Sequence, residues 1–199
     1  TLTPQHALGC IPRTDAFATD QSLPAGKRAD PSDYAGTGYD KGHVAPDGDM
    51  SWDPQVETES FLMTNMMPQL PGLNRGIWKL LETAVRGWVV QRGHNMLVYA
   101  GPIYSTADPV IGANHVVVPH AFYKIVVDGT TGEVAGFLFP QTGNQGNDLT
   151  RVRATVAQIQ QQTGVDFGIT ADQKELALNQ LWPVDFGALT NSKKAVCKQ

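Results

Sequence analysis

The chain has 199 residues, enough for one sizeable hydrophobic core and short for two domains of ordinary size, so we expect a single domain over residues 1–199. Its hydrophobic content of 41% and charged content of 17% lie in the globular range, and no apolar run approaches the ~20 residues that span a bilayer, which argues against a membrane protein. The formal net charge of −4 counts against tight nucleic-acid binding, because phosphate neutralisation usually requires a basic surface.

The N-terminal part of the chain shows little periodicity. Residues 1–38 are rich in Pro, Gly, Asp and Thr, and we expect irregular surface structure that leads into a strand near Gly38-Tyr39-Asp40. The clearest helix is predicted from Asn74 to Trp88, where apolar residues recur at three- and four-residue spacing and form one buried stripe. Those residues are Ile77, Leu80, Leu81, Ala84, Val85 and Trp88.

Three strands are predicted in the middle of the chain. Residues 96–100 form a short apolar run that should stop at Gly101-Pro102. Residues 122–127 and 133–139 flank the turn-rich segment 128–132, a pattern typical of a hairpin.

The C-terminal third is predicted to be helical again. Val152, Val156 and Ile159 mark a helix face that ends at Gly164, which suits a left-handed C-cap. Thr170 followed by Gln173 resembles a capping box and predicts a further short helix. The fold class is therefore α+β, with a central antiparallel sheet flanked by helices.

The two cysteines, Cys10 and Cys197, lie near opposite ends of the chain. Termini of one domain are often close in space, so we expect a disulfide, with two unrelated reduced thiols as the alternative. A disulfide would favour a secreted or periplasmic location, because such bonds persist in oxidising compartments. The chain begins at Thr1 without an initiator Met, which indicates a processed or trimmed product.

A dense local pattern surrounds His43, in the sequence Tyr39-Asp40-Lys41-Gly42-His43-Val44-Ala45-Pro46. Gly42 should let the backbone turn tightly and Pro46 should end the regular structure, which would place the imidazole at a strand end facing a cleft. A neutral imidazole can take a proton from water near neutral pH. The remaining histidines, namely His6, His94, His115 and His120, lack such neighbours and are interpreted as ordinary residues.

The predicted helix carries three polar residues in order. The amide oxygen of Asn74 can hold a hard, hydrated cation such as Mg²⁺. Glu82 lies eight residues on, about 12 Å further along the axis, so it should reach back to a water on that metal rather than bind the metal directly. Arg86 is placed to pair with Glu82 and to offer its guanidinium to a phosphate oxygen. The alternative is an ordinary solvated Glu–Arg pair.

Other site types find little support. The sequence has no Cys-x-x-Cys or His-Glu-x-x-His zinc pattern and no Gly-x-Ser-x-Gly nucleophile turn. The aspartates near His43 lack the spacing of a calcium loop and are interpreted as turn and cap residues. They are Asp40, Asp47, Asp49 and Asp53.

These residues together resemble the DNA/RNA non-specific endonuclease family, the ββα-metal or His-Me finger nucleases related to mitochondrial endonuclease G. The resemblance covers nearly the whole chain. It rests on Asp40-Lys41-Gly42-His43, on Thr64-Asn65-Met66 with Pro68-Gln69, and on Asn74, Glu82 and Arg86. Later segments, residues 97–103, 118–124 and 164–167, also resemble the family's strands and closing helix.

The resemblance implies a general base at His43, a Mg²⁺ ligand at Asn74 with Mn²⁺ as the alternative ion, and auxiliary roles for Glu82 and Arg86. It also implies that Asn65 and Gln69 support the site. Many members have Arg where this chain has Lys41, and lysine supplies a point charge without the bidentate fork. A second basic residue, which the family places well upstream, is not fixed by spacing; Lys27 and Arg28 are candidates.

The implied function is a Mg²⁺-dependent, sugar-non-specific endonuclease. His43 would deprotonate a water that attacks phosphorus in line, leaving 5′-phosphate ends. Because this scheme uses no 2′-hydroxyl and reads no base edge, DNA and RNA should both be substrates, without strong sequence preference. Two alternatives stay open: an inactive binding module that keeps the fold, and a phosphodiesterase acting on small nucleotides.

Overall fold

The computed structural model describes residues 1–170 and 172–198. Its central feature is a five-stranded sheet in the order β3 (Met96–Ile103), β6 (Ala121–Asp128), β7 (Glu133–Pro140) and β8 (Arg153–Ala154), with β9 (Lys174–Glu175) also paired to β7. All of these pairings are antiparallel except β7 with β9, which is parallel. The predicted α+β class and the predicted hairpin are confirmed.

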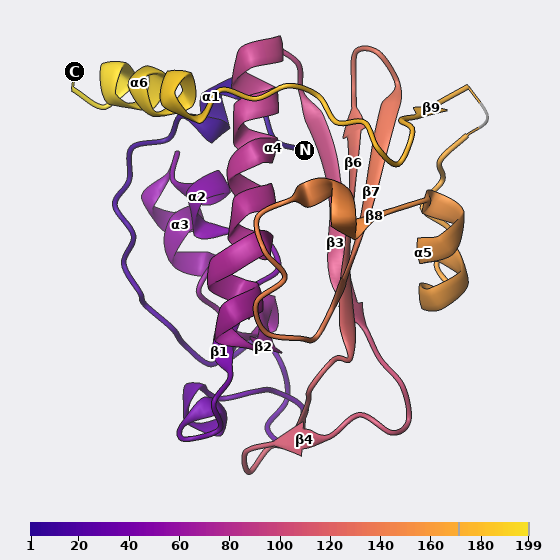
Figure 1. Cartoon of the computed structure of the whole chain (residues 1–199). Coiled ribbons are helices and arrows are strands. Elements are labelled where there is room, and N and C mark those ends of the chain that lie inside the picture. Colours follow the sequence, from indigo (N-terminus) through magenta and orange to yellow (C-terminus); the bar gives the residue numbers. More distant parts are fainter. Residues whose placement is uncertain (171, 199) are drawn as a thin grey trace.

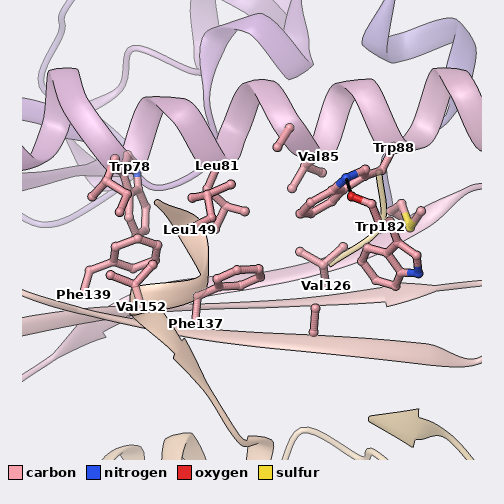
Figure 2. Close-up of a cluster of buried hydrophobic side chains, with 14 of the residues drawn as sticks. Trp78, Leu81, Val85, Trp88, Val126, Phe137, Phe139, Leu149, Val152 and Trp182 are labelled. Atoms are coloured by element: carbon pink, nitrogen blue, oxygen red, sulfur yellow. Dashed lines mark hydrogen bonds between the residues drawn. The ribbon is translucent and has the colours of Figure 1, made fainter. Parts of the chain in front are cut away.

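Helices cover both faces of this sheet (Figure 1). Alternate residues of a strand point to opposite faces, so Phe122 and Val126 of β6 pack toward α4 (Lys79–Arg92), while Ile125 and Val127 pack toward α5 (Val156–Thr163). The larger core lies on the α4 side, where Trp78, Leu81, Val85 and Trp88 meet Val126, Phe137 and Phe139 (Figure 2). Trp182 closes this core, and its carbonyl oxygen accepts a hydrogen bond of 2.8 Å from Trp88 Nε1.

A second, two-stranded antiparallel sheet precedes the long helix. It pairs β1 (Asp40–His43) with β2 (Met66–Gln69), which confirms the strand expected near Asp40. The predicted helix from Asn74 is interrupted, however. Leu73–Trp78 forms a π-helical segment, η3, in which Gly76 leaves helical backbone angles, and α4 starts at Lys79. Asn74 therefore stands on a separate turn ahead of α4.

Two other predicted boundaries differ from the structure. Strand β3 continues through Gly101-Pro102 to Ile103, which the sheet permits because β3 is an edge strand and proline's missing N–H is tolerated there. The helix predicted after Thr170 is wrong. Thr170 N–H instead donates to Gln173 Oε1 and closes a turn, and the next residues join the sheet as β9. The C-cap at Gly164 is confirmed, with φ of 68°.

Short elements make up much of the remainder. Most of residues 1–38 is irregular, as expected. Helix α4 lies between the sheet and helices α2 and α3 (Figure 1). Within the described residues, no helix combines the length and apolar character needed to cross a membrane. The short elements are α1 (Pro4–Ala7), η1 (Pro31–Tyr34), α2 (Asp47–Met50), α3 (Pro54–Glu59), η2 (Met63–Asn65), β4 (Val110–Ile111), β5 (Val116–Val117) and η4 (Leu149–Val152).

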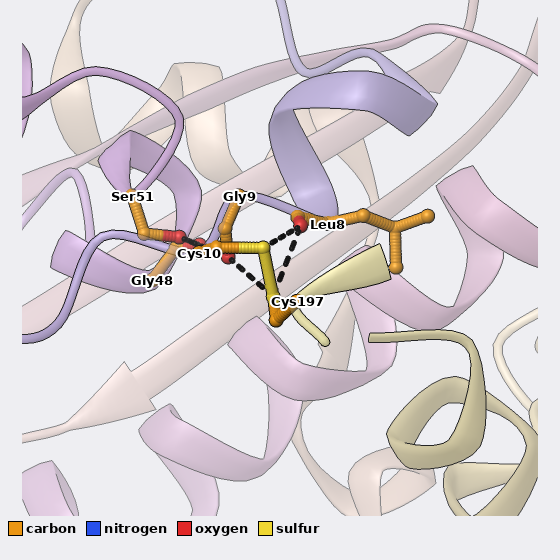
Figure 3. Close-up of a disulfide and its surroundings, with 6 residues drawn as sticks. All are labelled: Leu8, Gly9, Cys10, Gly48, Ser51 and Cys197. Atoms are coloured by element: carbon orange, nitrogen blue, oxygen red, sulfur yellow. Dashed lines mark hydrogen bonds between the residues drawn. A yellow bond between two sulfur atoms is a disulfide. The ribbon is translucent and has the colours of Figure 1, made fainter. Parts of the chain in front are cut away.

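The expected disulfide is present between Cys10 and Cys197 (Figure 3). Cys197 directly follows α6 (Phe186–Val196), and Cys10 lies shortly after α1. The bond therefore ties the C-terminal helix to the N-terminal segment across 187 residues of sequence.

Loss of this bond should destabilise the protein. Closing a loop of this length restricts the unfolded chain by about 5 kcal/mol in the chain-entropy picture, so a Cys10→Ser, Cys197→Ser double variant should unfold at clearly lower urea concentration. Urea unfolding of the parent with and without reductant checks this, because the sequence contains no other cysteine. Equal midpoints, or two alkylatable thiols in the native protein, would contradict the expectation.

Candidate active site

His43 ends strand β1 and lines a cleft of about 760 Å³. Its ring packs edge-on against Phe61, with ring centroids 4.8 Å apart, and near Phe17, and its backbone oxygen accepts a hydrogen bond of 3.1 Å from Trp78 Nε1. Burial lowers the pKa of His43 to about 4, and the nearby Asp47 carboxylate only partly opposes that shift. The imidazole is therefore neutral near pH 7 and can accept a proton.

The two ring nitrogens of His43 differ in environment. Nε2 is buried, and no described residue offers it a hydrogen-bond partner. Because His43 nevertheless lines the cleft, Nδ1 is the nitrogen placed to meet a ligand there. The predicted location of the imidazole, at a strand end facing a cleft, agrees with this geometry.

Gly42 serves a purpose other than the predicted tight turn. It lies within the extended strand β1, and a Cβ at this position would stand 2.0 Å from Gln69 Oε1. The absence of a side chain thus lets Gln69 pack against the strand immediately before His43. Gln69 is 1% exposed, which is consistent with a supporting role.

Asn65 fixes the segment that follows His43. Its side-chain Oδ1 accepts from the Ala45 N–H at 2.9 Å, and its Nδ2 donates to the carbonyl oxygens of Ala45 and Ser60, both at 2.8 Å. Its backbone oxygen also accepts from the Val44 N–H. The amide is therefore engaged by backbone groups, and Asn65 acts on the site by holding the chain beside His43.

Asn74 is oriented by a carboxylate from β1. Its Nδ2 donates to Asp40 Oδ2 at 2.9 Å, and Arg75 binds both oxygens of the same carboxylate. These hydrogen bonds outweigh burial and hold the pKa of Asp40 below its usual value. With its nitrogen held in this way, Asn74 has its amide oxygen left for the cleft that it lines.

Glu82 and Arg86 both line the cleft, but they do not form the predicted pair with each other. Arg86 Nη1 instead binds Asp49 Oδ1 at 2.8 Å, and Glu82 Oε1 binds Lys124 Nζ at 3.2 Å. Asp49 belongs to α2 and Lys124 to β6, so Arg86 and Glu82 each pair with an opposite charge from another element and not with each other. Asp49, interpreted from the sequence as a turn residue, is thus the ion-pair partner of Arg86.

Lys41 projects into the cleft between two aromatic rings. Its Nζ lies 4.8 Å from the ring centroid of Phe17 and 5.9 Å from that of Tyr34. No carboxylate of the described residues lies within 4.0 Å of its ammonium, which leaves its N–H donors available.

Arg13 is a basic residue upstream of His43 that lines the cleft and that the sequence did not single out. It lines the cleft, binds Asp47 at 2.7 Å and lies over the ring of Phe61, whereas Lys27 and Arg28 are absent from the described cleft lining. No local pattern marks Arg13, which sits in the irregular N-terminal segment 30 residues before His43.

The cleft is more basic than the whole chain. Five cationic side chains line it against three acidic ones, although the chain carries a net charge of −4. The positive charge is therefore concentrated at the cleft, where a phosphate could bind. The cations are Arg13, Lys41, Arg75, Lys79 and Arg86; the acids are Asp40, Asp47 and Glu82.

The donor chemistry of the cleft suits a hard cation held by few protein ligands. Residues 1–170 and 172–198 contain no cluster of three or more His, Cys, Asp or Glu side chains arranged as a metal site. The Asn74 amide oxygen, oriented by Asp40, and the Glu82 carboxylate, which lines the same cleft, are oxygen donors of the type that Mg²⁺ accepts while keeping most of its water.

The chain is similar to several known proteins. The sequence model of the DNA/RNA non-specific endonuclease family matches residues 2–174. A nuclease of Nostoc sp. is 38% identical over 172 residues, which cover 80% of this chain and 62% of that nuclease. Human mitochondrial endonuclease G is 30% identical over 181 residues, which cover 83% of this chain and 61% of the human protein. The chain thus spans about three fifths of the length of these relatives.

A solved structure is also similar. The crystal structure of an EndoG/EndoGI complex, which concerns EndoG inhibition, contains a chain that superposes with a TM-score of 0.76 at 25% sequence identity. The match covers 90% of this chain and 76% of that one. The order β1, β2 and then the η3–α4 helix therefore corresponds to the ββα arrangement that the sequence predicts.

Proposed function

Because the chain belongs to the DNA/RNA non-specific endonuclease family, we propose that it is a Mg²⁺-dependent endonuclease that hydrolyses DNA and RNA to 5′-phosphate ends. One observation carries the proposal: a neutral imidazole, an oriented amide oxygen and five cationic side chains line the same cleft. These are a proton acceptor, a ligand for a hard cation and donors for a phosphate, which together suffice for phosphodiester hydrolysis.

In this proposal His43 is the general base. Nδ1 accepts a proton from a water, the oxygen of that water bonds to phosphorus, and the bond to the 3′-oxygen breaks in line with it. The leaving 3′-oxygen takes up a proton from a second water and becomes the 3′-hydroxyl of the upstream fragment. The tight packing of His43 against Phe61 and Phe17, and the hydrogen bond from Trp78, fix the imidazole before substrate arrives. The phosphate therefore stays on the 5′-oxygen of the downstream fragment.

Asn74 would hold the metal through its amide oxygen, with Asp40 and Arg75 fixing the orientation of that amide. The ion supplies positive charge to the phosphate oxygens when bound, and Mn²⁺ is the alternative ion. Lys41, Arg13 and Arg86 would bind the phosphates of the substrate. All of these contacts are to phosphate, so the proposed mechanism discriminates neither by sugar nor by base.

Lys41 should contribute to activity through its positive charge. Lys41→Ala should lower kcat/KM by roughly 10- to 100-fold, the range expected for a hydrogen bond to a charged group, with the loss growing as salt screens the remaining cations. Lys41→Arg should change activity little, because arginine keeps the positive charge and can make the same cation–π contacts with Phe17 and Tyr34. Steady-state kinetics at two salt concentrations check this, with the exposed Lys27→Ala as control. A higher kcat in Lys41→Arg would instead favour bidentate phosphate binding.

The proposed function is tested by digesting plasmid DNA and RNA with Mg²⁺, with and without EDTA. Cleavage of both polymers that stops with EDTA is the expected result. Two alternatives predict different outcomes. An inactive binding module would bind the polymers without cutting them. A phosphodiesterase specific for small nucleotides would cleave a small phosphodiester and leave both polymers uncut.

We also propose that residues 1–199 form a single nuclease domain with an extracytoplasmic location. The Cys10–Cys197 disulfide supports both parts, because it joins the two ends of the chain and such bonds persist in oxidising compartments. Some relatives are mitochondrial, so fractionation of the producing cell decides the location. Recovery of the protein in the cytosol would contradict it.

A further inference from the structure

Lys124 is a buried lysine for which the proposed reaction has no use. It lies on the central strand β6, on the face that packs toward α4, and only 2% of it is exposed. Lysine is almost never fully buried unless it is paired, because removing the ammonium from water is costly. The neighbours of Lys124 should therefore explain its presence.

Two contacts place this ammonium next to the candidate active site. Lys124 Nζ lies 3.2 Å from Glu82 Oε1 and 4.1 Å from the ring centroid of Trp78. The same Trp78 donates through Nε1 to the backbone oxygen of His43. One side chain on the sheet thus contacts both a carboxylate of the cleft and the indole that fixes the strand of the general base.

Glu82 stands between Lys124 and the cleft. It lines the cleft and also a smaller cavity of about 320 Å³, whose walls include Lys124 and Asp49. Lys124 is not among the described residues that line the cleft itself, so it contacts Glu82 from outside the cleft. Lys124 Nζ donates a hydrogen bond to Glu82 Oε1, which leaves Oε2 for a partner in the cleft.

The buried Glu82 carboxylate depends on its ion pair with Lys124. Burial raises the pKa of Glu82, whereas the charges of Lys124 and Arg86 oppose that rise. Since Arg86 makes its own ion pair with Asp49, Lys124 is the cation bound directly to the Glu82 carboxylate. Without it, the carboxylate would be a buried charge held by no direct ion pair.

We propose that Lys124 is a positioning residue, which aims the Glu82 carboxylate into the cleft and holds it there. The proposal rests on the proposed function, because it assigns a support to the same site. A residue that supports an active-site ligand from outside contributes typically about 10- to 100-fold to activity.

The test begins with Lys124→Met, which keeps the length and apolar contact of the side chain and removes its charge. We expect kcat on plasmid DNA to fall by roughly 10- to 100-fold, with little change in KM, because substrate phosphates do not contact Lys124. The control is Lys174→Met, on the exposed strand β9 of the same sheet, which should match the parent. A folded Lys124→Met enzyme with the parent's kcat overturns the proposal.

The second comparison uses Glu82→Gln with and without Lys124→Met. If Lys124 acts through Glu82, adding Lys124→Met to Glu82→Gln lowers kcat little further. The double variant should also be more resistant to urea than Lys124→Met alone, because it leaves no buried charge unpaired. Equal losses from Lys124→Met in both backgrounds overturn the proposal. If Lys124→Met alone fails to fold, the double variant decides: kcat equal to that of Glu82→Gln supports the proposal, and a lower kcat contradicts it.

Different results would reject the proposed function and the positioning role of Lys124. Absence of polymer cleavage by the parent protein would reject the proposed function before any variant is compared. Cleavage by the parent together with an indifferent Lys124 would reject only the positioning role.

Discussion

His43→Ala should abolish most of the activity while leaving the fold intact. Removing a general base typically lowers the rate by about 10²- to 10⁴-fold, and His43 is the residue whose environment keeps an imidazole neutral beside the cleft. Its backbone contacts, including the hydrogen bond from Trp78 to its carbonyl oxygen, do not depend on the side chain. The loss should therefore appear in kcat without global unfolding.

A matched control is His120→Ala. His120 is largely exposed, pairs with Asp108 and does not belong to the described cleft lining, so this variant should keep the parent's rate. Circular dichroism and urea unfolding of both variants separate chemistry from stability. A folded His43→Ala protein that retains more than a tenth of the parent's activity, well above what loss of a general base leaves, would move the base elsewhere.

Asn74→Ala should change the response to metal. It removes the amide oxygen that we propose as the protein's direct ligand to the metal. The rate at low Mg²⁺ should therefore fall by more than the roughly 10- to 100-fold that is typical when a residue supporting a metal ligand is removed. High Mg²⁺ should partly restore the rate. Titration of activity with Mg²⁺ measures this directly. Asn191→Ala, an exposed residue on α6, is the control.

The alternative outcome for Asn74 is equally clear. A lower rate with an unchanged Mg²⁺ midpoint would place the metal on other oxygens of the cleft, such as those of Glu82. The Asp40 carboxylate would then no longer be needed to orient an amide ligand, and Asp40→Asn should leave the titration unaltered.

The sequence predicted those parts of the site that depend on local pattern. His43 at the end of a strand and the disulfide follow from motif and spacing, and the structure agrees with both. The helix was placed by its apolar periodicity, but its interruption at Gly76 was not, since a glycine inside a helical pattern does not by itself reveal a π-helical segment.

Contacts between distant segments were the parts that sequence reasoning missed. Arg86 was expected to pair within its own helix, yet Asp49, 37 residues away, lies closer in space. Arg13 reaches the cleft from an irregular segment without periodicity, and β9 replaces a predicted helix because it pairs with β7. In each case tertiary packing supplied an interaction stronger than the local preference.

The most direct test of the account is cleavage of covalently closed circular single-stranded DNA and circular RNA, which have no ends for an exonuclease. We expect the parent protein with Mg²⁺ to open both circles and leave 5′-phosphates. EDTA should prevent this, and His43→Ala should leave the circles almost intact. Intact circles incubated with the folded parent protein and Mg²⁺ would contradict it.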